Sequence, residues 1–295
     1  MGYWNGNEES NAPEQLKGSL KQAIAGSLEA FAGRKRFSRA AQMSAESMVE
    51  LLLTVRRRNL ESEMQAMGIS VTRSALSKRR RTLTPELMRD ILLRFNAMCE
   101  DKRTYRGYRM IMAYRTEIRT ARQGGYRLPV QTKYDVMNKV YLDAAVCGSA
   151  GTGGTEGVSP PVTLSGCSDN GEYRELWSAP WGIEAAAEEQ RCGLRLANAH
   201  GRSDACLEQE LWASMIFFNF CSRIAGSLVP PPERTAGGYR VNAAVTADLC
   251  RDFYRSPDGN GASLMRAIAR YVEWIPAVPD AAEKDRNGFC FSIAT

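Results

Sequence analysis

The most constraining feature of the sequence is the stretch from Trp177 to Ile224, which predicts two helices separated by a turn. Pro180 suits the first position of the first helix, because that position needs no backbone N–H. Glu184 would lie in the first turn, where the helix dipole favours a carboxylate, and Arg191 would share its face. Such a pair could serve phosphate and metal chemistry, or it could form a surface ion pair. The second helix is long and apolar, and we expect the chain to be organised around this stretch.

The front half of the chain is strongly basic. Residues 34–127 hold 22 Lys and Arg against 9 Asp and Glu, a net charge of +13, whereas the whole chain carries +6. A surplus of this size indicates a polyanionic partner, most simply nucleic acid. A solvated basic face is the competing interpretation.

Cysteine, histidine and hydropathy patterns exclude several classes of site. The eight cysteines are dispersed without a C-x-x-C pair, and His200 is the only histidine. A zinc site and a His-based nucleophilic triad are therefore not expected. The N-terminal segment lacks the apolar core of a signal peptide, and no apolar run is long enough to span a bilayer. We expect no membrane association and a cytoplasmic location.

Residues 34–104 predict a series of short helices. Their expected starts are at or just after Ser44, Leu60, Thr72 and Thr84. Gly68 should end the second helix, and the third is basic and runs to about Arg80. A short helix, a tight turn with glycine and a basic helix form the outline of a helix-turn-helix, which binds DNA.

The middle of the chain predicts β-structure followed by a linker. Met110 to Ala113 is typical of a buried strand, and residues 132–146 predict a hairpin that turns at Asn138-Lys139. Residues 148–170 are rich in Gly, Ser and Pro without a period, which predicts a flexible linker.

Several segments, in chain order, together carry a family resemblance. They are RKRFS from Arg34, MVELLL from Met48, VTRSALSKRRRTLTPE from Val71, YRGYRMIMAYRTEI from Tyr105, WGIE from Trp181, FFNFC from Phe217, and the scattered matches Tyr239, Val241, Asn242, Cys250, Arg251 and Phe253. The pattern resembles insertion-sequence transposases of the IS-four group, DDE-type enzymes with an RNase H-like core. This implies an α/β fold, with an N-terminal all-helical DNA-binding domain before an RNase H-like mixed sheet flanked by helices. Part of the core and its inserted β region would be missing.

The resemblance divides the chain into four parts. These are a mobile N-terminal arm or loosely docked helix (1–33), a helical DNA-binding domain (34–104), a transposase core interrupted by the linker 148–170 (105–228), and a C-terminal helical tail (229–295). The tail should include an amphipathic helix from Leu264 to Trp274.

The resemblance also shows which catalytic residues are lost. Glu184 matches the catalytic Glu, Tyr114 falls at the position of the first catalytic Asp, and the second Asp has no counterpart. Intact relatives use Mg²⁺ held by several carboxylates, whereas a phenol is a poor ligand at neutral pH. Glu184 alone would hold the metal weakly. Glu117 could replace the first Asp only if the strand ended before it, because side chains alternate along a strand.

The same resemblance implies contacts with double-stranded transposon-end DNA. The candidate DNA-contacting residues are Arg34, Lys35, Arg36, Arg73, Lys78, Arg79, Arg80 and Arg191. Asp135 and Asp143 match family acids that are not catalytic, so we expect structural or turn roles for them.

We therefore expect a transposase-family protein that binds DNA and has lost strand cleavage. A non-catalytic DNA-binding regulator, a repurposed transposase remnant and a decayed reading frame are the alternatives. Self-association or association with an intact transposase would provide further partners.

Overall fold

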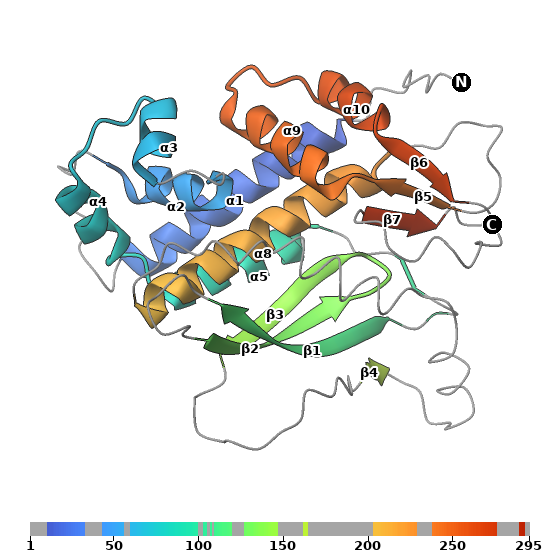
Figure 1. The fold of residues 1–295 in the computed structure, drawn as a ribbon, viewed down its shortest axis with the longest axis horizontal. Helices are drawn as coiled ribbons and strands as arrows, with labels where there is room; N and C mark the ends of the chain where they lie inside the picture. Colours follow the sequence, from blue (N-terminus) through green and yellow to red (C-terminus); the bar gives the residue numbers. More distant parts are fainter. Residues whose placement is uncertain are drawn as a thin grey trace.

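The computed structural model describes residues 11–32, 43–55, 60–99, 103–104, 107, 109–119, 127–146, 162–164, 203–228, 238–275 and 289–292. In these ranges the fold combines helices with antiparallel sheets, as expected for an α/β chain (Figure 1). The helices are α1 (Ala12–Ala32), α2 (Ala45–Thr54), α3 (Leu60–Ala66), α4 (Arg73–Arg80), α5 (Pro85–Met98), α8 (Asp204–Gly226), α9 (Ala243–Arg255) and α10 (Gly261–Ala269). The strands are β1 (Met110–Arg119), β2 (Arg127–Asp135), β3 (Val140–Val146), β4 (Val162–Leu164), β5 (Gly238–Val241), β6 (Val272–Ile275) and β7 (Phe289–Ser292). None of the described helices is long and apolar enough to cross a membrane.

The helix starts predicted from capping residues are confirmed. The hydroxyls of Ser44, Thr72 and Thr84 each accept a hydrogen bond from the backbone N–H three residues later. Pro85 follows its cap at the start of α5. Gly68 has a φ of 68°, a left-handed conformation that suits glycine and ends the segment after α3.

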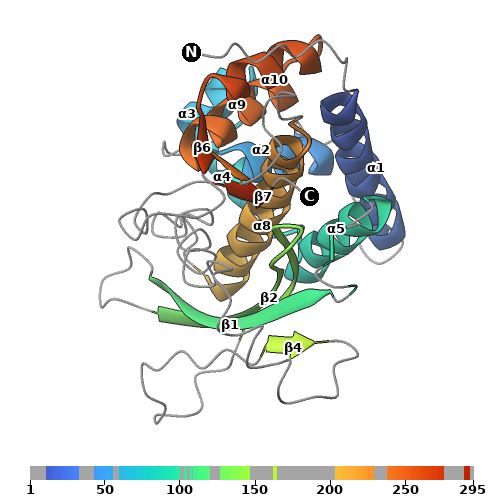
Figure 2. The same cartoon turned by 90° about the vertical axis from the view of Figure 1, so that its right-hand side faces the viewer.

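The expected long apolar helix is α8, and it forms the centre of the molecule. Helices α1, α2 and α5, strand β3, and helices α9 and α10 all pack against it (Figure 2). Its buried side chains point in every direction around the axis, including the fully buried Leu211, Ile216 and Phe220. One cluster of buried apolar side chains joins all these elements. The helices of 45–98 therefore share a core with the sheet.

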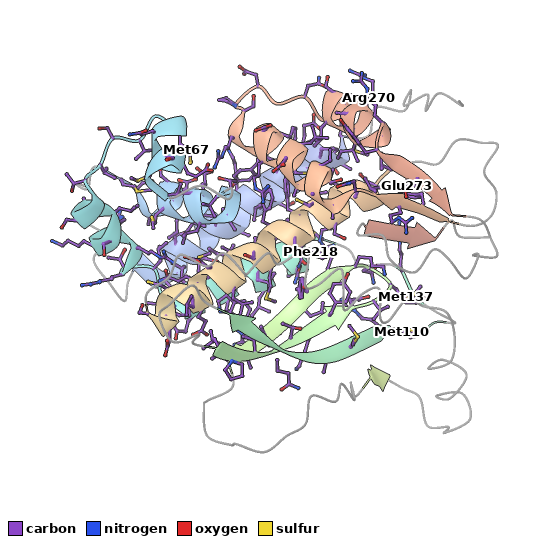
Figure 3. All side chains as sticks on the ribbon, viewed as in Figure 1. Met67, Met110, Met137, Phe218, Arg270 and Glu273 are labelled. Carbon is purple, nitrogen blue, oxygen red and sulfur yellow. The ribbon has the colours of Figure 1, made fainter. Side chains whose placement is uncertain are left out.

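The larger sheet has the strand order β3-β2-β1-β4 and lies below α8 and α5 (Figures 1 and 2). The predicted hairpin is confirmed, since β2 and β3 are joined by a turn at 136–139 in which Lys139 has a φ of 55°. Phe218 of α8 points toward the sheet (Figure 3). Its ring centroid lies 6.2 Å from that of Tyr134 and 5.0 Å from that of Tyr141, in edge-to-face contacts.

Two expectations for the sheet need correction. We expected a mixed sheet, but every pairing among the described strands is antiparallel. A tight hairpin such as β2–β3 can connect only antiparallel strands. Three residues of the expected linker, 162–164, instead form β4 and pair with β1.

An asparagine of α8 forms hydrogen bonds with the backbone at the edge of this sheet. Strand β3 is at the edge of the sheet formed by the described strands, so none of these strands bonds to the backbone groups on its outer side. The fully buried Asn219 takes the place of a neighbouring strand. Its Oδ1 accepts from the Tyr141 N–H at 2.7 Å, and its Nδ2 donates to the Tyr141 carbonyl at 2.8 Å. Asn96 of α5 donates to the same carbonyl at 2.8 Å. The sheet edge is thus fixed to two helices.

Helix α1 is packed into the fold, which corrects our expectation of a mobile N-terminal arm. Leu20, Ala23 and Ile24 of α1 are fully buried against α5, α8 and α2. At the other end of the chain, Glu14 accepts from the Gly261 N–H at the start of α10, at 2.5 Å. Lys17 donates to the Phe253 carbonyl, at 3.0 Å, near the end of α9. An anion at a helix N-terminus and a cation at a helix C-terminus are both favoured by the helix dipole.

The C-terminal tail contains a sheet as well as helices. Strand β5 pairs on its two sides with β6 and β7. The helix expected from Leu264 to Trp274 therefore ends at Ala269, and Trp274 pairs with Tyr239 of β5. The buried Tyr239 hydroxyl donates to the Ala225 carbonyl of α8 at 3.1 Å, which holds β5 beside the central helix. Backbone pairing with β5 then makes residues 272–275 a strand in place of a longer helix.

Replacing Asn219 with leucine should destabilise the fold by about 2–3 kcal/mol, because the buried Tyr141 N–H loses its acceptor. Urea unfolding measures the loss. The matched control is Ser222→Ala, since Ser222 is also buried on α8 but its hydroxyl has no hydrogen-bond partner among the described residues. This control should cost less than about 1 kcal/mol. Equal losses for both variants would contradict the role of Asn219.

Candidate nucleic-acid interface

The helix-turn-helix outline corresponds to α3, a turn and α4 at one end of the molecule (Figure 1). Helix α4 has the sequence RSALSKRR and no acidic residue. Arg81 follows as its C-cap with a helical backbone. Five of these nine residues are basic, so α4 is a compact source of positive charge.

The residues of α4 separate into two faces. Leu76 and Arg80, four residues apart, are buried against the rest of the molecule. Ser74, Ser77, Lys78 and Arg81 are exposed and follow the spacing i, i+3, i+4, i+7 of one helical face. We name these four residues the α4 stripe. It presents hydroxyl, ammonium and guanidinium donors together, which is the donor set used to contact phosphate oxygens.

We expected Arg80 to contact DNA, but its side chain faces α8, so this expectation needs correction. Its Nη2 donates to Glu210 Oε1 at 2.6 Å and to the Cys206 carbonyl at 2.8 Å, and its Nε donates to Gln209 Oε1 at 3.1 Å. The Arg80 and Glu210 side chains are only 8% and 10% exposed. Gln209 Nε2 also donates to the carbonyl of Arg80, the last residue of α4, and to that of Leu83, which follows the helix. We name Arg80, Gln209 and Glu210 the Arg80 cluster.

The other predicted DNA contacts have different outcomes. Lys78 lies in the α4 stripe, and Arg79 is half-buried on the same helix. Arg73 begins α4, and its side chain lies outside the described atoms. Arg34, Lys35, Arg36 and Arg191 lie outside the described residues. We did not predict Arg81 as a DNA contact from the sequence, although its spacing of three residues from Lys78 and four from Ser77 places it on their face.

The backbone around Tyr114 is regular strand. Tyr114 pairs with Thr132, and the next positions continue in register to Arg119, which pairs with Arg127. Glu117 pairs with Pro129 inside this strand. The strand therefore does not end before Glu117, and the condition for Glu117 to replace the missing Asp is not met. Glu184 lies outside the described residues.

Asp135 has the turn role expected of it. The fully buried carboxylate accepts from the backbone N–H groups of Met137 and Asn138 at 3.1 and 3.0 Å, within the turn after β2. It also accepts from Arg109 Nε at 2.6 Å and from Asn138 Nδ2 at 3.0 Å. Met110 and Met137 mark this end of the sheet in Figure 3.

Asp143 has a structural role. It accepts from Arg89 Nε at 2.9 Å and Nη2 at 2.8 Å, in a two-point contact between β3 and α5. Burial raises the pKa of Asp143, but the hydrogen bonds from Arg89 and from the Ala144 N–H outweigh burial, so the pKa lies below its usual value. Both hairpin carboxylates are therefore occupied by arginines.

These carboxylates do not fit a magnesium site. Two-metal phosphoryl chemistry needs several carboxylate oxygens free to bind metal. Among the described residues, no three His, Cys, Asp or Glu side chains lie close enough together to hold an ion. Asp135 and Asp143 direct their oxygens to arginines and backbone N–H groups, and the partner of Tyr114 across the sheet is Thr132.

Comparison with known proteins adds no relative. No protein family, no curated protein and no solved structure matches the chain.

Asp143→Asn should lower the melting temperature at pH 7 but not in acid. Because the pKa of Asp143 is lowered in the folded state, its ion pair stabilises the fold above about pH 4 and is lost as the pH falls through that lowered pKa. The Arg89 side chain is 49% exposed, so the effect should stay below about 1 kcal/mol. Melting curves of both proteins from pH 7 to pH 3 measure it. A difference that stays constant with pH would contradict the assignment.

Proposed function

We propose that this protein binds double-stranded DNA through the α4 stripe and does not cleave it, as a DNA-binding protein of the IS-four transposase lineage. The observation that carries the proposal is the stripe itself. Four outward donors lie on one face of a capped basic helix, while the opposite face is fixed to the core.

The dimensions and charge of α4 support this proposal. An α-helix with its side chains is about 10–12 Å across, which fits the roughly 12 Å width of the major groove of B-DNA. Lys78 and Arg81 would neutralise phosphates and release counterions, and the Ser74 and Ser77 hydroxyls would donate to phosphate oxygens. The net charge of +13 over residues 34–127 would attract DNA over a longer range.

The proposal includes an RNase H-like origin for the sheet and α8. The antiparallel strands β1, β2 and β3 with a long helix across one face support such an origin. The continuous core and the pairing of β4 with β1 favour a retained, non-catalytic protein over a decayed reading frame. Such a protein would compete with an intact transposase for the same DNA ends, which is the role of a regulator.

Lys78→Gln with Arg81→Gln should weaken DNA binding about tenfold near 0.1 M salt, because two phosphate contacts are lost. The slope of log affinity against log salt should fall in magnitude by about 2. Fluorescence anisotropy of a labelled duplex across a salt series measures both quantities.

The matched control is Arg266→Gln with Arg270→Gln. It removes the same charge from the exposed Arg266 of α10 and from Arg270, the exposed residue that caps the end of α10, at the opposite end of the molecule from α4 (Figures 1 and 3). This control should retain the parent affinity within about twofold, apart from the small effect of net charge. Equal losses in the two double variants would refute a site on α4.

The purified chain should not cleave end-labelled transposon DNA in Mg²⁺, because the carboxylates needed to hold two ions are incomplete. Gel analysis of the labelled strand measures cleavage. Glu184→Gln is the control, and Mg²⁺-dependent cleavage that this substitution abolished would show that catalysis is retained.

A further inference from the structure

Helix α4 has little apolar surface with which to hold its place. An isolated helix of eight residues is unstable in water, so α4 depends on contacts with the rest of the chain. Leu76 is its one large buried apolar side chain, and Leu83 follows after the helix. Neither contact fixes the rotation of α4 about its axis, because a leucine side chain packs without directional bonds.

The Arg80 cluster supplies the directional bonds. A guanidinium is planar, and three acceptors at 2.6, 2.8 and 3.1 Å define its orientation. Gln209 fixes the end of the helix, because its amide donates to the Arg80 and Leu83 carbonyls. The cluster therefore sets both the position and the rotation of α4 on the first turns of α8.

We infer that Gln209 and Glu210, far along the chain from α4, are positioning residues for DNA binding. By holding Arg80 they turn the α4 stripe outward, so that Ser74, Ser77, Lys78 and Arg81 reach one duplex together. This inference rests on the proposed function. It also assigns Arg80 an indirect role, in place of direct contact with phosphate.

The charge of Glu210 makes the inference testable. Glu210→Ala raises the net charge by one, so electrostatics alone predicts equal or tighter DNA binding. Direct contact by Arg80 also predicts tighter binding, because Arg80 would be released. Positioning predicts the opposite result, weaker binding by about tenfold, because the unpaired Arg80 no longer holds α4 in place.

The matched control is Glu273→Ala. Glu273 also pairs with an arginine, Arg240, at 2.9 Å, but its side chain is 53% exposed and it lies at the far end of the molecule (Figure 3). This variant has the same change in charge and should bind DNA at least as tightly as the parent chain. A loss equal to that of Glu210→Ala would overturn the inference.

A second variant separates positioning from direct contact. Arg80→Met with Glu210→Met replaces the ion pair by apolar side chains, which often preserve packing at a buried site. It should bind DNA within about twofold of the parent, because the methionines fill the buried site and Gln209 still donates to the backbone carbonyls at positions 80 and 83, so α4 keeps its orientation. If this variant is folded and binds about tenfold more weakly, Arg80 itself contacts DNA and the inference is overturned.

Amide hydrogen exchange provides the structural readout. In Glu210→Ala the amides of residues 73–83 should exchange about tenfold faster than in the parent, while those of 85–98 should be unchanged. The double methionine variant should restore protection to 73–83. Unchanged exchange in Glu210→Ala would overturn the inference.

The DNA-binding measurements distinguish failure of the proposed function from failure of the positioning role. If the parent chain does not bind DNA at low salt, both fail. If Lys78→Gln with Arg81→Gln weakens binding and Glu210→Ala does not, only the positioning role fails.

Discussion

The structure depends on the burial of α8, a helix that is enclosed on nearly all sides. A buried helix has to form hydrogen bonds with most of the polar groups it carries, because an unpaired polar group in an apolar core is costly. Gln209 and Glu210 bond to α4, and Asn219 bonds to the edge strand β3. The polar side chains of α8 thus attach the surface elements, while its apolar side chains supply the core.

The sheet and the proposed DNA-binding helix are attached to α8 by different chemistry. Asn219 offers one acceptor and one donor to the Tyr141 backbone, in the way a neighbouring strand would. Glu210 offers a charge that balances the buried Arg80. Charge pairing also engages the two carboxylates of the hairpin. Asp135 and Asp143 pair with Arg109 and Arg89, so two arginines of the basic segment 34–127 hold the hairpin in place.

Prediction from the sequence was accurate where the cause is local. Ser44, Thr72 and Thr84 cap helices because their hydroxyls reach N–H groups three residues away. It failed where distant parts of the chain meet. The polar start of the chain suggested an arm, yet α1 is buried and contacts α9 and α10 through Lys17 and Glu14. The apolar spacing from Leu264 to Trp274 suggested one helix, but pairing with β5 placed Trp274 in a strand.

The sequence alone determined the helix starts, the hairpin turn, the apolar central helix and the concentration of positive charge before residue 128. Each of these follows from neighbours within a few residues or from composition. Only the tertiary structure decided which basic residues face outward. Arg80 and Arg81 are adjacent and chemically identical, but the helical rotation turns one toward Glu210 and the other toward solvent. That choice depends on a carboxylate 130 residues away along the chain, which no local pattern contains.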